Sequence, residues 1–134
     1  MATLRKEIPV SASADQVWDV IRDVGAIHTR LAPGFVVDTQ LEEGARRVKF
    51  ANGLVVRELI VTVDAQTKRL AYAVVGGTAV HHNASFQVFP TNGGGATLVW
   101  ISDFLPDSAT AAFSTMIDAG SDVIKRTLDS LESL

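Results

Sequence analysis

The sequence predicts an α+β fold, in which a curved antiparallel sheet of about seven strands wraps around one long C-terminal helix. Three observations predict it. A strand pattern and two short helical patterns open the chain, regularly spaced turn signals divide its middle into runs rich in Val, Thr and aromatic residues, and one long amphipathic pattern closes it. At 134 residues, we expect one domain covering residues 1–134.

The elements before the sheet are two short helices. Residues 3–10 predict the first strand. Ser13 and Gln16 then have the spacing of a capping box, so a helix is predicted to begin there, and Gly25 is expected to end it. A second short helical turn, over residues 26–31, stops before a Pro-Gly pair.

Turn signals divide residues 35–104 into the six remaining strands. They are Glu43-Gly44, Asn52-Gly53, residues 64–68, Gly76-Gly77 and residues 92–95. The Asn-Gly pair predicts a two-residue type I′ turn, because that turn needs positive φ at both positions. The last helix is expected over residues 108–131, capped by Asp107 or Ser108.

Counting outward from each turn predicts which side chains share a face of the sheet. The expected pairs are Ala51 with Leu54, Arg47 with Glu58, Val63 with Arg69, Ile60 with Tyr72, Tyr72 with His82, Phe86 with Trp100, and His82 with Phe104. One face then carries Arg47, Glu58, Ile60, Tyr72, Val74, His82, Ala84, Phe86, Val88, Trp100, Ser102 and Phe104. We expect this mainly apolar face to form the concave wall of a ligand pocket.

The opposite face of the fourth strand is too apolar for a plain solvent face. It would carry Val55, Arg57, Leu59, Val61 and Val63. Either the predicted register is inverted there, or this band contacts a helix or a partner subunit, which makes a homodimer one expectation.

Composition argues against several classes of protein. The net charge of −3 and the scattered basic residues argue against a nucleic-acid-binding protein. The absence of cysteine excludes disulfides and thiol ligands, and His81 and His82 point to opposite faces of a strand, so no metal site or cofactor is expected. No apolar stretch reaches membrane-spanning length and no signal peptide is visible, so a cytoplasmic location is expected.

Several segments together resemble the polyketide cyclase/dehydrase and lipid-transport family, within the START-like, birch-pollen-allergen-like helix-grip (SRPBCC) superfamily. They are Val17-Trp18-Asp19-Val20-Ile21-Arg22-Asp23, Gly44-Ala45-Arg46-Arg47, Gly53 through Arg57-Glu58-Leu59, Asp64, Tyr72, Trp100, Phe104 and Pro106. The resemblance covers nearly the whole chain and implies the helix-grip fold. The family's Gly-x-x-Arg and later Glu fall on Arg47 and Glu58, and a Trp that the family often has near Leu31 is missing here.

Glu58 and His82 are the candidate catalytic residues. A Glu58 carboxylate held by Arg47 is suited to act as the general base for enolisation, and His82 could act as its acid partner or as a base, with Tyr72 donating to an oxyanion. The alternatives are a structural ion pair that spans two strands and a half-buried strand histidine.

Three functions therefore stay open. The first is binding of a small hydrophobic ligand, such as a lipid, a polyketide or an aromatic metabolite, between the sheet and the last helix. The second is a cyclase or dehydratase activity, and the third is a protein-interaction module that uses the apolar outer band. The expected ligand-binding residues are Arg47, Glu58, Tyr72, His82, Phe86, Trp100, Ser102, Phe104, Phe113, Met116, Ile117 and Gly120.

Overall fold

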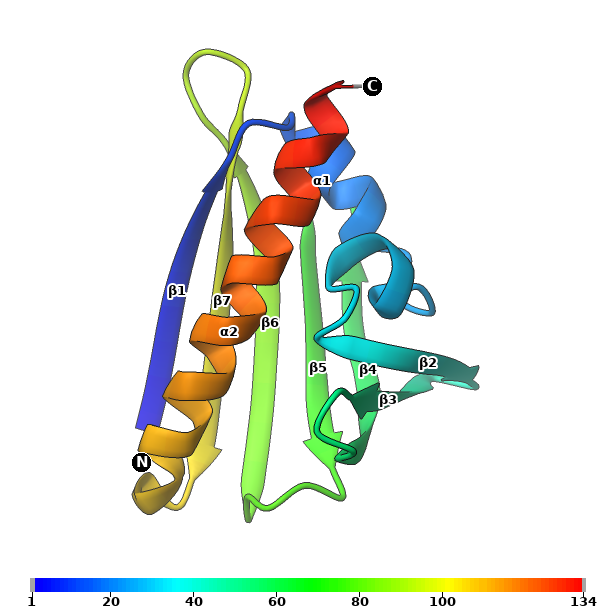
Figure 1. Ribbon diagram of the computed structural model, residues 1–134, viewed down its shortest axis with the longest axis vertical. Coiled ribbons are helices and arrows are strands. Elements are labelled where there is room, and N and C mark those ends of the chain that lie inside the picture. Colours follow the sequence, from blue (N-terminus) through cyan, green and yellow to red (C-terminus); the bar gives the residue numbers. More distant parts are fainter. Residues whose placement is uncertain (1, 134) are drawn as a thin grey trace.

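A curved antiparallel sheet with one long helix across its inner face forms the molecule (Figure 1). The computed structural model describes residues 2–133, and the side chains of residues 2–131. The seven strands lie in the order β1-β7-β6-β5-β4-β3-β2. They are β1 (Ala2–Val10), β2 (Val36–Glu42), β3 (Ala45–Phe50), β4 (Val55–Asp64), β5 (Arg69–Val75), β6 (His81–Pro90) and β7 (Ala96–Leu105). The predicted fold class is confirmed.

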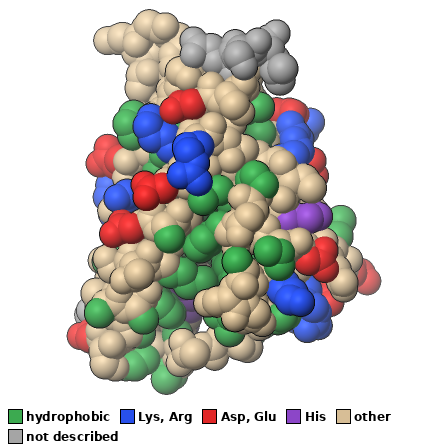
Figure 2. Space-filling view, in the orientation of Figure 1, with side chains coloured by type: hydrophobic (Ala, Val, Ile, Leu, Met, Phe, Trp, Pro, Cys, Tyr) green, Lys and Arg blue, Asp and Glu red, His purple; other side chains and the backbone are tan. Residues whose placement is uncertain are grey.

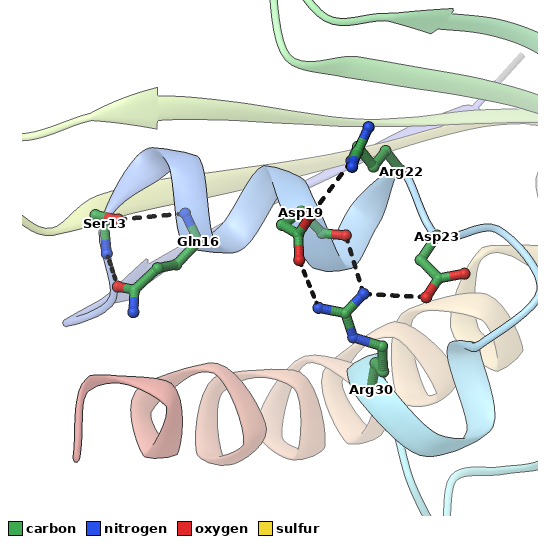
Figure 3. Close-up of polar contacts among 6 residues, drawn as sticks. All are labelled: Ser13, Gln16, Asp19, Arg22, Asp23 and Arg30. Carbon is green, nitrogen blue, oxygen red and sulfur yellow. Dashed lines mark hydrogen bonds and ion pairs between the residues drawn. The ribbon is translucent and has the colours of Figure 1, made fainter. Parts of the chain in front are cut away.

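The first helix, α1 (Ala14–Ile21), begins at the predicted capping box. The Ser13 hydroxyl accepts from the Gln16 amide at 3.2 Å, and the Gln16 side chain accepts from the Ser13 amide at 2.9 Å (Figure 3). The helix ends at Arg22, three residues before the glycine that was expected to end it. The predicted second helical turn is present as a π-helical turn, η1 (Ile27–Leu31).

Arg30 joins η1 to α1. Its guanidinium donates to Asp19 at 2.8 Å and to Asp23 at 3.0 Å, and Asp19 also pairs with Arg22 (Figure 3). A polar surface hollow of about 360 Å³ lies beside these residues and is also bordered by Trp18. Because each of these charges already has a partner of opposite sign, the cluster fixes the two helical segments together.

The long helix, α2 (Thr110–Asp129), follows a 3₁₀ turn, η2 (Asp107–Ala109), and leads into another, η3 (Ser130–Ser133). It therefore starts two residues later than predicted. Its buried face consists of Ile117, Gly120, Ser121, Ile124 and Leu128. Lys6 and Asp118 pair at 3.1 Å, and Lys125 donates to the Pro9 carbonyl at 2.6 Å, so α2 is fixed along the edge strand β1.

The register of the β6–β7 hairpin is as predicted: Phe86 lies opposite Trp100, and His82 lies opposite Phe104. The β5–β6 register is wrong by two residues, because Tyr72 lies opposite Ala84 instead of His82. A shift of two keeps every side chain on its predicted face, since side chains alternate along a strand.

A β-bulge at Val61 offsets a one-residue error in the predicted β4–β5 register. Arg69 pairs with Asp64 and not with Val63, yet the predicted pair of Ile60 and Tyr72 is present, because the bulge takes up one extra residue. The bulge also changes the face of Val63, which pairs with buried Leu70. Val63 therefore does not belong to the outer band, and the band as described below consists of Val55, Leu59 and Val61.

The β3–β4 hairpin contradicts the prediction at the most important point. Lys49 pairs with Val55, so the connection is a three-residue loop, Ala51 to Gly53, in place of a two-residue turn. Of the Asn-Gly pair only the glycine has positive φ, at 90°, which is the geometry of a type I turn followed by a left-handed residue. The Ala51 amide donates instead to the Phe35 carbonyl at 3.0 Å.

This loop decides which arginine faces inward. Arg46 lies opposite Glu58, and Arg47 lies opposite Arg57 on the outer face, so the predicted pair of Arg47 with Glu58 is wrong. The predicted register would also have turned Lys49 toward the core, where Val48 is now almost fully buried. Burying an unpaired ammonium group costs far more free energy than adopting a less favoured turn. The chain therefore forms the three-residue loop.

Candidate functional site

A partly open pocket of about 80 Å³ lies between the inner face of the sheet and the first half of α2. Figure 2 shows hydrophobic side chains through the centre and lower part of this face of the molecule, where the pocket lies. The loop between β5 and β6 borders it at the foot of Figure 1. The lining residues are Phe35, Phe50, Leu54, Val56, Glu58, Tyr72, Val74, Gly77, Thr78, Ala79, His82, Trp100, Ser102, Phe113, Met116 and Ile117.

Flat rings form much of the pocket wall. Phe113 of α2 stacks on His82 of β6 with ring centroids 4.9 Å apart, and Phe35 meets Phe50 edge to face at 5.5 Å. Trp100 lies on β7, and its ring stacks on the ring of Phe86, its partner on the neighbouring strand β6, with centroids 4.9 Å apart. These contacts hold the rings in fixed planes, as aromatic pairs do in protein cores.

Glu58 is the one carboxylate in the wall, and it is buried. Its Oε1 atom accepts from Arg46 Nε at 2.8 Å. Within residues 2–131, Oε2 has no hydrogen-bond partner. The carboxylate therefore has one oxygen fixed by a buried ion pair and one oxygen available to a ligand.

Arg46 holds Glu58 from outside the pocket. The guanidinium lies over the Tyr72 ring, 5.1 Å from its centroid, and Nη1 donates to the Val24 carbonyl at 3.4 Å. Only 3% of the Arg46 side chain is exposed. The positive charge of Arg46 is thus paired with Glu58 and does not face the pocket.

Tyr72 brings a hydroxyl to the same region. It accepts a hydrogen bond from Trp100 Nε1 at 3.1 Å, which leaves its own proton free to be donated. Burial raises the pKa of the phenol far above its ordinary value, and the negative charge of Glu58 raises the pKa further. Tyr72 is therefore a permanent donor at physiological pH.

His82 is half-buried beside Phe113, and its neighbour His81 points the other way to contact Asn83. Burial lowers the pKa of the His82 imidazole, and the charge of His81 lowers it further. The ring is therefore mostly neutral at pH 7, with one nitrogen able to donate and one able to accept.

Comparison with known protein families identifies the chain. The model of the family described as polyketide cyclase/dehydrase and lipid transport matches residues 1–134. The chain belongs to this family.

Solved structures agree with the family's fold. The protein XoxI from Bacillus cereus is 17% identical to this family member, with a TM-score of 0.87 over 98% of this chain and 99% of that one. A START superfamily protein from Mycobacterium smegmatis is 11% identical (TM-score 0.78, covering 96% and 98%), and norcoclaurine synthase from Thalictrum flavum is 19% identical (TM-score 0.74, covering 98% and 96%). No curated protein matches the chain significantly.

The structure brings most of the expected site residues together. Those that line the pocket are Glu58, Tyr72, His82, Trp100, Ser102, Phe113, Met116 and Ile117. Phe86 and Phe104 lie beneath this wall, in contact with Trp100 and with Phe113 and His82 respectively. Arg47 is the exception, because it lies on the outer face and pairs there with Glu42 at 3.3 Å.

Gly120 lies behind the pocket, where α2 approaches the sheet closely. A Cβ atom at this position would come within 3.0 Å of the Phe35 ring and 3.3 Å of the Trp100 ring. The glycine thus sets the position of two wall residues without lining the cavity.

The sequence reasoning missed several wall residues. They are Phe35, Phe50, Leu54, Val56, Gly77, Thr78 and Ala79, whereas Val74 was already placed on the expected wall. Val56 shares the face of Glu58 and could have been found from strand alternation. Phe35 comes from the segment before β2, and only the pairing of Val36 with Phe50 brings it to the site, which no local pattern indicates.

Two further tests of the site concern metals and membranes. Among residues 2–131, no group of three or more His, Asp or Glu side chains is arranged to hold a metal ion. Of the helices in the described part of the chain, none is long and apolar enough to cross a membrane.

Proposed function

We propose that this family member binds a small, mainly apolar ligand in the pocket between the sheet and α2. The observation that carries the proposal is the buried Glu58 carboxylate in an aromatic and aliphatic wall, with one oxygen lacking a protein partner. Ligand sites are typically apolar, with a few polar groups that fix orientation. Tyr72 and His82 would supply the remaining polar contacts.

The size of the pocket limits what enters it. A cavity of about 150 Å³ holds benzene, and the volume of this pocket is about 80 Å³. A ligand with one ring would therefore place only part of the ring inside and extend through the mouth, or it would displace Phe113 or the β5–β6 loop.

A thermal-shift screen of lipids, flavonoids and aromatic polyketides tests the proposal. A ligand at 100 times its Kd should stabilise the native state by about 2.7 kcal/mol. The Ala79→Phe variant should abolish the shift by filling the pocket, and the same change at exposed Ala111, which does not line it, should leave the shift intact. A shift that survives Ala79→Phe would contradict the location.

A second candidate is a cyclase or dehydratase that uses Glu58 or His82 as a general base. The unpartnered Glu58 oxygen supports it, because a base must reach the substrate proton directly. If Glu58 is that base, the variant Glu58→Gln must lose turnover while binding persists. Equal turnover in both proteins would exclude Glu58 as the base.

A further inference from the structure

The charges around the pocket point to a ligand class narrower than "hydrophobic". Resting on the proposed binding function, we propose that the pocket selects compact aromatic compounds that carry a hydrogen-bond donor, such as a phenol or an aryl amide, and rejects aromatic carboxylates of the same shape.

The first argument is the absence of a cation in the described wall. Among its sixteen residues there is no Lys or Arg, and the only acidic one is Glu58. Arg46 is bound to Glu58, Val24 and the Tyr72 ring, so its charge is already used. A ligand carboxylate would lose its hydration and meet a second carboxylate without a counter-charge, which is strongly unfavourable at low dielectric.

The second argument is the free Glu58 oxygen. Oε2 accepts from no described residue and is open to the pocket, so a ligand N–H or O–H group can donate a charge-assisted hydrogen bond to it. A phenol suits the site further because its oxygen can also accept. Tyr72 lies on the neighbouring strand, diagonally across from Glu58 on the same face, and has a proton to donate.

The third argument is shape. The stacked His82–Phe113 pair and the Phe35–Phe50 pair form flat walls around a small volume. Flat rings pack against such walls by stacked or edge contacts, which an acyl chain lacks. His82 does not reverse the charge argument, because burial lowers its pKa and keeps the ring mostly neutral.

Two pairs of shape-matched probes test this: phenol against toluene, and benzamide against benzoate. Each is titrated into ¹⁵N-labelled protein at pH 7.5, and the Kd is taken from the shift of the Trp100 indole N–H signal, a group in the pocket wall. We expect phenol to bind at least tenfold more tightly than toluene, and benzamide at least tenfold more tightly than benzoate.

The outcomes separate this inference from the proposed function. If toluene and phenol bind equally, or benzoate binds as well as benzamide, the pocket binds ligands but the selection for a donor is wrong. If none of the four probes shifts the Trp100 signal up to its solubility limit, this inference fails together with binding of compact rings. Binding of phenol and benzamide alone supports both.

A substitution at Glu58 should weaken the preference for benzamide over benzoate. Glu58→Gln removes the acceptor charge and leaves the buried Arg46 cation without its counter-ion. The advantage of benzamide over benzoate should then fall at least tenfold. Glu42→Gln is the control, because Glu42 pairs with Arg47 and Arg57 on the outer face and should leave the ratio unchanged. If Glu58→Gln does not fold, the four probes on the native protein still decide the question.

Discussion

Two neighbouring arginines have opposite environments in this protein. Arg46 is buried and bonded to Glu58, whereas Arg47 lies on the outer face with about half of its side chain exposed. Both belong to the segment that resembles the family motif, and the sequence reasoning chose the wrong one. The error came from one residue of loop length and not from the choice of Glu58.

This difference predicts unequal effects of the same substitution. Arg46→Met should lower the free energy of unfolding by about 3–5 kcal/mol, because it leaves the buried Glu58 carboxylate unpaired. Arg47→Met should cost less than about 1 kcal/mol, as expected for an exposed pair. Urea denaturation of both variants checks this, and equal losses would contradict the assigned register.

Tyr72 predicts an unusual alkaline titration. It is the only tyrosine of the chain, so the absorbance of tyrosinate near 295 nm reports this residue alone. Because its pKa is raised, the folded protein should show no ionisation at pH 10, where a free tyrosine is half ionised. The unfolded chain releases that proton near pH 10, so stability should fall as pH rises above this value. A titration midpoint near 10 without unfolding would contradict the buried placement.

His82 should affect stability at the acid side. Its pKa is lowered in the folded state, so the unfolded chain binds a proton more readily as pH falls through about 6.5. Stability should therefore decrease from pH 7 toward pH 5, and the decrease should be smaller in His82→Asn. Thermal unfolding of the native protein and of His82→Asn at several pH values measures this. Identical pH profiles of the native protein and His82→Asn would contradict it.

For the helices and strands, the predictions were correct where the local sequence signals agree, and wrong where two signals favour different structures. The capping box fixed the start of α1, and the β6–β7 hairpin had its predicted register, because alternating apolar residues and a glycine-rich turn agree there. The β3–β4 loop failed because the Asn-Gly turn preference opposed the burial of Lys49. No local sequence signal indicated the bulge at Val61. The predicted pair of Ile60 and Tyr72 was nevertheless correct, because the bulge offsets the one-residue error in the predicted partner of Arg69.

Helix α2 gives a prediction about Gly120. Alanine favours a helix over glycine by about 1 kcal/mol, but its Cβ would press on the Phe35 ring. Because Phe35 borders the cavity, it can move inward, so Gly120→Ala should be at least as stable as the native protein and should bind ligand more weakly. Exposed Ala119→Gly measures the helix preference alone. A loss of more than about 1 kcal/mol in Gly120→Ala would mean that the wall cannot yield.

For the whole molecule, the open question is the outer face. The outer band leaves Val55 and Val61 41% and 63% exposed, and no element of the described chain covers them. If this band is the contact between two copies of the chain, the molecular mass measured by light scattering should rise with protein concentration. The Val61→Lys variant should not show this rise. An oligomer whose mass is unchanged by Val61→Lys would exclude the band as its contact.

The β3–β4 loop also has an evolutionary consequence. The length of this loop buries Arg46 and exposes Arg47, so selection should act more strongly on the first of these two neighbouring arginines. Related sequences should retain an arginine, or exchange it only together with the glutamate, at position 46, while position 47 should drift freely among hydrophilic residues. In a related protein with one residue fewer in the strand before the loop, a different residue would face the glutamate. We expect the ligand of such a protein to differ as well.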